Sequence, residues 1–456
     1  MKIKICLLLL LMTNICFAKN YLDENLKKIK WNDIEVVWIE DDSLPTYDIL
    51  FYFKEGALGE TKSNAGEVEL MFSQLTSGTN RYSQKEILEN LEFFSTNYDS
   101  HVTHEYSTFS VSGLVKDLVP SMKMICHMFD DAKFPDVELK RMKKRIESGI
   151  KTMVTNHSQL ANHVFRIESM KGSGFELPTT GTLASIKKIE SKDLKKRLDY
   201  FNKNVFKRIY IRGPSAVTDL KNIIVNDCRW AQGELRKDVP TQNNEGKLSQ
   251  NIILIPVPNA NQAQIRIGKF INSSEISFIK SDLKTFTAKY MGGGFTSQLI
   301  QSLRVGKGLT YSASAYASEQ KNYGRAGIST FTKNESLVEM LKAIDEVVQK
   351  NETTINSEEL ARAKRSAKGQ YLLSLESTSD FLSNLLFFDH IGRNYEDIYK
   401  FTNNIEKLNS NDLKLMVAEL FNMKKQTILI VGDKSLKKIL EKEGHKVSVR
   451  KIKDYL

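Results

Sequence analysis

Residues Ile186–Gly213, IKKIESKDLKKRLDYFNKNVFKRIYIRG, have a counterpart in the same chain at Ile405–Gly432, IEKLNSNDLKLMVAELFNMKKQTILIVG. The two segments align without a gap at an offset of 219 residues (213 to 432), with Ile, Lys, Ser, Asp, Leu and Gly at equivalent places. Internal repeats dictate architecture. Twice this offset is 438 residues, nearly the whole chain of 456, so the stretch predicts a duplicated domain.

Each copy predicts a helix followed by a strand. Ser191 and Ser410 are candidate N-caps, because each stands just before a polar–apolar helical pattern. The apolar runs Ile209–Ile211 and Thr427–Val431 then indicate strands, and a glycine closes each of them.

The two halves also begin alike, with strand-like segments. In the first half VVWIE precedes Leu44–Gly56, and in the second half Ile252–Gly268 indicates two strands around a Pro/Asn turn. Strands mixed with long helical patterns predict an α+β fold, in which each domain packs helices on a largely antiparallel sheet. The polar segment Lys237–Gln250 is the expected linker. The predicted division is a signal peptide at 1–18, domains at 19–236 and 251–456, and the linker at 237–250.

The N-terminus is typical of a secretory signal peptide. Lys2 and Lys4 precede the apolar run Ile5–Met12, and a small residue, Ala18, offers a cleavage site. A retained N-terminal anchor is the alternative, although the run is too short for a stable membrane span. We therefore expect a periplasmic or secreted protein.

Composition excludes several functional classes. Removing two lysines with the signal peptide lowers the net charge from +11 to +9, and the remaining charge is spread over amphipathic segments. Without a recognised motif, this pattern does not indicate nucleic-acid binding. Cys126 and Cys228 remain after cleavage, and an oxidising compartment would allow them to pair, but their spacing does not decide whether they do.

Three stretches together resemble the insulinase/pitrilysin-type zinc peptidases, the inverzincins. They are AGEVELMFSQLTSGT at Ala65–Thr79, FPDVELKRMKKRIESGI at Phe134–Ile150, and MGGGFTSQLIQSLRVGKGLTYSASAYAS at Met291–Ser318. The resemblance covers essentially the whole mature chain and implies two α+β domains per chain. In the family, four such domains enclose a chamber, and half-length chains work in pairs.

The zinc motif of that family, His-x-x-Glu-His on a helix, is not retained. Alignment on Gly78-Thr79 places the two histidines at Glu69 and Ser73 and the glutamate base at Phe72. The later glutamate ligand falls on Gly149, or on Ser148 or Glu147 if the alignment slips. Serine is a poor zinc ligand and phenylalanine cannot accept a proton, so we expect no zinc in this chain.

The seven histidines do not replace the lost motif. His101 and His104 lie in SHVTHEYSTFSV, which alternates like a strand, and three residues apart they would point to opposite faces. His127 follows Cys126 in an apolar helical pattern and is expected in or beside the core, which leaves Cys–His catalysis a remote alternative.

The Arg/Tyr segment of the family is retained as Arg304 and Tyr311 in LRVGKGLTYS. The resemblance implies that these residues bind the substrate backbone and polarise the scissile carbonyl, while a zinc-bearing paralogous partner supplies the metal. The alternative is that Arg304 is a surface ion-pair residue and Tyr311 a core residue of a strand. Gly292-Gly293-Gly294 lacks the spacing of a phosphate-binding loop and is expected to be a turn before the helix Ser297–Arg304.

The sequence therefore favours a non-zinc, substrate-binding subunit of a two-chain peptidase that acts on peptides. Two alternatives stay open. One is a purely structural or binding protein without a role in catalysis, and the other is a peptidase with an unconventional site. The resemblance implies zinc in the partner subunit and none in this chain, which we expect to be inactive alone.

Overall fold

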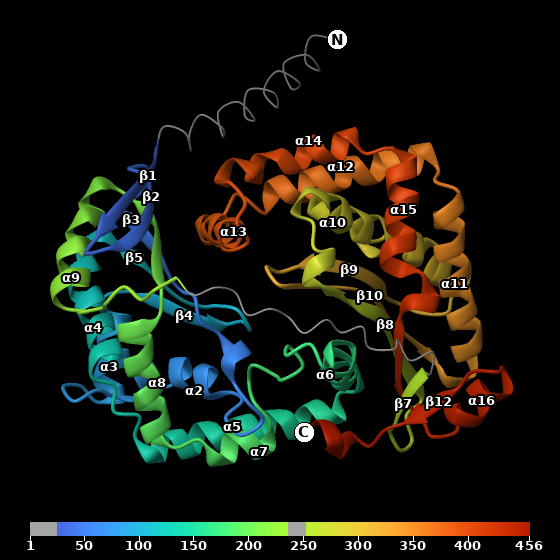
Figure 1. Ribbon diagram of the computed structural model, residues 1–456, viewed down its shortest axis with the longest axis horizontal. Coiled ribbons are helices and arrows are strands. Elements are labelled where there is room, and N and C mark those ends of the chain that lie inside the picture. The colour runs from blue at the N-terminus through green and yellow to red at the C-terminus, as the bar shows by residue number, and fades with distance from the viewer. Residues whose placement is uncertain (1–24, 236–251) are drawn as a thin grey trace, which may run out of the picture.

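The computed structural model describes residues 25–235 and 252–456 and consists of two sheet-and-helix domains side by side (Figure 1). Each domain has a six-stranded sheet, so the predicted fold class is confirmed. The predicted signal peptide, 1–18, and the predicted linker, 237–250, lie outside the described residues.

The first sheet has the strand order β1-β2-β6-β3-β5-β4. Its strands are β1 (Leu26–Trp31), β2 (Ile34–Glu40), β3 (Thr46–Phe53), β4 (Asn97–Val102), β5 (Ser107–Leu114) and β6 (Lys207–Gly213). Only β2 and β6 pair in parallel, and the other pairs are antiparallel.

The second sheet repeats this plan in the order β12-β7-β11-β8-β10-β9. Its strands are β7 (Ile252–Pro256), β8 (Gln262–Asn272), β9 (Ala313–Glu319), β10 (Tyr323–Lys333), β11 (Thr427–Gly432) and β12 (Val447–Val449). The halves differ at one edge, which an N-terminal strand fills in the first sheet and a C-terminal strand fills in the second.

The helices of each domain, apart from α6 and α13, cover one face of its sheet (Figure 1). Those of the first half are α2 (Glu67–Ser73), α3 (Gln84–Phe93), α4 (Leu118–Asp130), α5 (Asp136–Thr155), α6 (His157–Met170), α7 (Leu183–Lys188), α8 (Ser191–Asn204) and α9 (Leu220–Asn226). Those of the second half are α10 (Phe278–Gly292), α11 (Leu337–Thr353), α12 (Ser357–Leu373), α13 (Thr378–His390), α14 (Lys400–Lys407), α15 (Ser410–Phe421) and α16 (Leu436–Lys442). Each domain buries a large apolar core between these helices and its sheet.

The repeat contains α8–β6 in the first half and α15–β11 in the second. The predicted N-caps, Ser191 and Ser410, were each wrong by one residue. Both serines are the first residues of their helices, and the N-caps are Glu190 and Asn409. The aspartate shared by both copies has a common role. Asp193 accepts the backbone N–H of Glu190 at 2.8 Å, and Asp412 accepts that of Asn409 at 3.1 Å, so the same carboxylate closes both helix starts.

The two domains exchange one helix each. α6, from the first half, packs on β8 and β11 of the second sheet, whereas α13, from the second half, packs on β3 and β6 of the first sheet (Figure 1). Each exchanged helix builds a small core on the sheet face that the domain's own helices leave open. Neither domain is complete without the other, because the second face of each sheet is buried by a helix that comes from the other domain.

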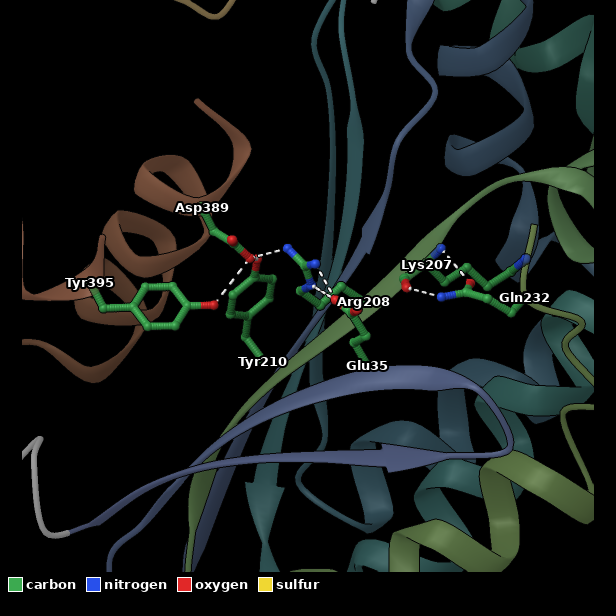
Figure 2. Close-up of polar contacts among 7 residues, drawn as sticks. All are labelled: Glu35, Lys207, Arg208, Tyr210, Gln232, Asp389 and Tyr395. Atoms are coloured by element: carbon green, nitrogen blue, oxygen red, sulfur yellow. Dashed lines mark hydrogen bonds and ion pairs between the residues drawn. The ribbon is translucent and has the colours of Figure 1, made fainter. Parts of the chain in front are cut away.

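A polar cluster fastens α13 to the first sheet (Figure 2). Asp389, on α13, accepts hydrogen bonds from Arg208 and Tyr210 of β6 and, at 3.1 Å, from the Tyr395 hydroxyl. Arg208 also donates through Nε to Glu35 at 2.8 Å. Burial and the Asp389 carboxylate raise the pKa of Tyr210 well above its usual range, so the phenol is a donor at every physiological pH.

The tips of two hairpins meet at the centre of the molecule. Glu105, in the β4–β5 turn, accepts hydrogen bonds from the backbone of Lys321 at 3.2 Å and of Asn322 at 3.1 Å in the β9–β10 turn. Beside them the ring centroids of Phe175 and Tyr323 lie 4.2 Å apart. These contacts and the exchanged helices hold the two domains in one arrangement.

Candidate functional site

The helix α2 stands where the resemblance places a zinc helix. Glu60 is buried and accepts the backbone N–H of Gly66 at 2.7 Å and of Val68 at 2.8 Å, so its carboxylate caps the start of α2. Burial raises the pKa of Glu60 to about 7. Glu67, in the first turn, forms a 2.7 Å ion pair with Arg197. The helix is therefore firmly positioned, although its expected metal ligands are absent.

Phe72, which the resemblance aligns with the glutamate base, belongs to the core. Its side chain is 3% exposed. Its ring centroid lies 5.5 Å from that of Phe201, 5.7 Å from Phe53 and 6.3 Å from Phe129. These distances are those of favourable aromatic pairs. The position that would activate water in a peptidase is here part of an aromatic cluster.

The two histidine positions carry poor ligands. Glu69 is partly exposed, and burial followed by repulsion from Asp99 raises the pKa of its carboxyl. The Ser73 hydroxyl donates to the backbone carbonyl of Leu70 at 3.0 Å. One carboxylate and one occupied hydroxyl do not make the nitrogen-rich ligand set that zinc takes in such motifs.

The position aligned with the third zinc ligand lies on α5 and is a glycine, Gly149, which has no side-chain atom that could bind a metal. Gly149 is exposed, and a Cβ built there would touch nothing within 4 Å. The neighbouring candidate Glu147 forms an ion pair with Lys151 at 2.9 Å, which lowers the pKa of its carboxyl. Within 25–235 and 252–456, no group of three His, Cys, Asp or Glu side chains is arranged to hold a metal ion. The residues present do not fit zinc.

Three of the seven histidines, His104, His163 and His390, make contacts within the fold. The expectation that His101 and His104 share a strand was wrong, because His101 lies in β4 and His104 lies in the turn before β5. His104 is buried and its Nε2 lies 2.9 Å from the carbonyl oxygen of Leu177. His163 and His390 likewise contact the Tyr455 carbonyl at 2.8 Å and the Tyr52 hydroxyl at 2.9 Å.

Cys126 and Cys228 form a disulfide that joins α4 to the segment after α9, with their Cα atoms 4.4 Å apart. The sequence left this pairing open. Both residues are buried, so Cys126 is not available as a nucleophile.

Arg304 and Tyr311 lie on a segment that is open to solvent. Arg304 is in the π-helical stretch Ile300–Gly306, a geometry that is frequent at functional sites. Its guanidinium lies 5.1 Å from the ring centroid of Phe295. Within the described part of the chain it forms no ion pair with a carboxylate, so the ion-pair alternative does not hold. Tyr311 is 79% exposed and precedes β9, so it is not a core residue.

Besides Tyr311, two large apolar side chains of this segment are exposed, namely Phe295 at 72% and Val305 at 66%. Exposed apolar clusters of this kind mark sites of interaction with other molecules. The predicted helix Ser297–Arg304 exists in a shifted form, since its π-helical part continues to Gly306.

The fold and the residues at the aligned ligand positions together define a relative of a metallopeptidase that lacks the family's zinc motif. Residues 35–181 match the family model described as insulinase (peptidase family M16), and residues 227–367 match the model described as the peptidase M16 inactive domain. Together these matches span well over half of the chain. The chain belongs to the insulinase family, peptidase family M16.

Some relatives of this chain are named as proteases and others as non-peptidase homologues. The chain is 21% identical, over 77% of its length and 85% of the relative, to a Bacillus subtilis protein named uncharacterized zinc protease YmxG. It is 22% identical, over 90% of its length and 94% of the relative, to a Helicobacter pylori protein named non-peptidase homolog YmxG.

Solved structures confirm the fold. A peptidase M16 inactive domain from Pseudomonas fluorescens superposes with a TM-score of 0.78 at 19% identity, covering 90% of this chain and 98% of the other. A protease from Helicobacter pylori superposes with a TM-score of 0.72 at 14% identity, covering 89% and 99%. Across the described residues, none of the helices has the length and apolarity that crossing a membrane requires.

Sequence reasoning missed three arginines that the fold brings together. Arg166 comes from α6, Arg266 from β8 and Arg325 from β10. The pattern of α6 shows an apolar face, with Leu160 and Val164 one turn apart, but it does not tell which sheet that face covers. The exchange of α6 between domains is what creates the cluster.

Proposed function

We propose that this chain is the non-zinc, substrate-binding subunit of a two-chain M16 peptidase that cleaves peptides in a closed chamber. The observation that carries the proposal is a contrast between two regions. The residues aligned with the zinc ligands, Glu69, Ser73 and Gly149, do not make the family's ligand set, whereas Tyr311 is exposed and Arg304 is half-buried in a solvent-facing segment. A chain that keeps the Arg/Tyr segment but lacks the zinc motif suits a role beside a zinc-bearing paralogue.

In this proposal the partner subunit holds the zinc that activates water, and this chain orients the substrate. The Arg304 guanidinium has donors in a planar fork that match the carbonyl oxygens of a peptide backbone. The Tyr311 hydroxyl, which is free in solvent, donates to the carbonyl oxygen on which negative charge develops. Binding by both residues aligns the scissile bond against the partner's site.

The proposed location is the periplasm or the cell exterior. The signal-like N-terminus supports it, and so does the Cys126–Cys228 disulfide, because structural disulfides persist in oxidising compartments.

The test is reconstitution of the mature chain with a paralogue that carries His-x-x-Glu-His. We expect each chain alone to be inactive on unstructured peptides and the pair to cleave them. Tyr311→Phe should lower kcat by roughly 10²-fold, as the loss of one oxyanion donor does elsewhere, and Arg304→Ala should lower kcat/KM without dissociating the pair. Arg145→Ala, which changes an exposed arginine of α5, is the matched control. Full activity of both Arg304 and Tyr311 variants would refute the roles given to them.

The alternative role is a structural or binding protein without a part in catalysis. A stable partner that lacks a zinc motif would establish this alternative, and Arg304 and Tyr311 would then be remnants of the fold.

A further inference from the structure

A cavity of about 360 Å³ lies between α6 and the open face of the second sheet. Its lining residues are Asn162, His163, Phe165 and Arg166 from α6 and Arg266, Tyr316, Arg325 and Ser329 from β8, β9 and β10. Both walls are regular structure, and they come from different halves of the chain. The cavity is therefore a product of the helix exchange.

Two glycines shape the floor of this cavity. A Cβ at Gly268 would come within 3.0 Å of the Phe165 ring, and a Cβ at Gly327 would come within 2.9 Å of the Tyr316 hydroxyl. The two rings therefore lie close over the sheet. They flank Arg325, whose guanidinium is 5.9 Å from the Phe165 centroid and 5.8 Å from that of Tyr316.

The three arginines contact only neutral oxygens or none. Arg266 donates to Asn162, Ser158 and two further backbone carbonyls, and Arg166 donates to the Leu177 carbonyl at 3.2 Å. Arg325 has a buried Nε without a hydrogen-bond partner. Among the described residues, none of the three forms an ion pair with a carboxylate.

Three adjacent positive charges without a counter-charge are unfavourable in a partly buried site. Burial lowers the pKa of Arg266 to about 10, and burial together with repulsion from Arg325 lowers that of Arg166 to about 10. An anion in the cavity would relieve this repulsion and satisfy the free donors of Arg325.

The rings beside the donors favour a carboxylate that is carried on an organic residue. Guanidinium groups bind the oxygens of a carboxylate or of a phosphate in a fork, so the donors alone do not choose between these anions. The rings of Phe165 and Tyr316 offer an apolar surface to the residue that bears the carboxylate. A related cavity under α13, also of about 360 Å³, carries Asp48 and Asp99 and would repel such a group.

We propose that the cavity between α6 and the second sheet binds a carboxylate of a peptide, with Arg325 and Arg166 as its direct partners and Arg266 as a fixed neighbouring charge. The carboxylate belongs either to the C-terminus of the peptide or to an acidic side chain. This inference rests on the proposed function only in naming a peptide, and it adds an anchoring point between α6 and the second sheet to the one proposed at Arg304 and Tyr311.

The test measures binding to the full mature chain without a partner, so its failure is separable from a failure of pairing or catalysis. The probes are three fluorescein-labelled pentapeptides. The first is all alanine with a free C-terminal carboxylate, the second is the same peptide with an amidated C-terminus, and the third is amidated and has a glutamate at its central position. Fluorescence anisotropy gives the Kd of each probe for the parent protein, Arg325→Gln and the control Arg145→Gln.

We expect amidation of the alanine peptide to weaken binding about ten- to a hundred-fold, the range of one charge-assisted hydrogen-bonded contact. Recovery of affinity in the amidated glutamate peptide would identify the side chain as a sufficient source of the carboxylate. Arg325→Gln should abolish the difference between free and amidated probes, while Arg145→Gln should leave it intact.

Folding of the variant is checked by thermal unfolding. Since Arg325 adds unrelieved charge, Arg325→Gln should be at least as stable as the parent without ligand, and acetate should raise the Tm of the parent more than that of the variant. Equal binding of free and amidated probes, an unchanged preference in Arg325→Gln, or displacement by inorganic phosphate at lower concentration than by acetate would overturn the proposal.

Discussion

Replacement of Phe72 by glutamate restores the base of the zinc motif in sequence, but we expect it to unfold the first domain at neutral pH. The side chain of Phe72 is 3% exposed and contacts three other aromatic rings. Loss of a buried phenylalanine costs roughly 3–5 kcal/mol, and an unpaired buried carboxylate adds several more. This sum approaches the whole stability of a typical domain, about 5–15 kcal/mol.

The assay is denaturant unfolding followed by tryptophan fluorescence. All three tryptophans, Trp31, Trp38 and Trp230, lie in the first half, and Trp230 packs 5.2 Å from Phe129 in the same cluster. Phe72→Leu is the control and should cost about 1.5 kcal/mol. Burial raises the pKa of the new carboxyl above its unfolded value, so the penalty should be largest at pH 8 and should shrink as pH falls to 5.

Equal stability of Phe72→Glu and Phe72→Leu at pH 8 would refute this reasoning. It would mean that the side chain at this position turns to solvent, and the zinc site would then be only a few substitutions away.

Three further predictions concern stability. The folded-state pKa of Glu60, about 7, lies above its ordinary value of 4.5, so the contribution of Glu60 to stability is full below pH 4.5 and is lost as pH rises through 7. The free energy of unfolding should therefore fall by about 3 kcal/mol over this pH range, and Glu60→Gln should remove that fall. A pH dependence that is unchanged in Glu60→Gln would contradict this prediction. Changing Cys126 and Cys228 together to alanine should cost about 4–5 kcal/mol, measured by denaturation with and without reductant, because the bond closes a loop of 102 residues; identical midpoints would argue against the bond. Asp389→Ala should loosen α13 by about 2 kcal/mol, seen as roughly 30-fold faster amide exchange in that helix alone, and exchange at the parent rate would show that apolar packing suffices.

The internal repeat made the duplicated α+β fold predictable from the sequence. Asp193 and Asp412 coincide because each closes a helix start, and the glycine after each copy ends a central strand. Local chemistry of this kind repeats in sequence because it depends on neighbours within a few residues.

The exchanged helices were not accessible, for a physical reason. An apolar face on α6 or α13 specifies that the helix is covered, but nothing local specifies the sheet that covers it. The same limit applies to the hairpin tips, since Glu105 meets Asn322 only in the folded molecule. His101 and His104 were placed on one strand because the turn between β4 and β5 has neither glycine nor proline to mark it.

The candidate site was accessible in part. Alignment on Gly78-Thr79 predicts which positions have lost the zinc ligands, and the structure adds that Phe72 lies in the core. The half-buried position of Arg304 and the exposure of Tyr311 could not be read from the sequence, because a tyrosine before an alternating strand is as compatible with a core as with a surface. Their roles in binding substrate stay a prediction.

One measurement tests the central claim most directly. The tagged mature chain is captured from the envelope of its own host, and the eluate is analysed for partner sequence, zinc content and cleavage of unstructured peptides. The account predicts a stoichiometric partner of similar size that bears His-x-x-Glu-His, about one zinc per pair, and activity that neither chain has alone. Zinc-dependent cleavage by this chain without a partner, or a stable partner without a zinc motif, would contradict it.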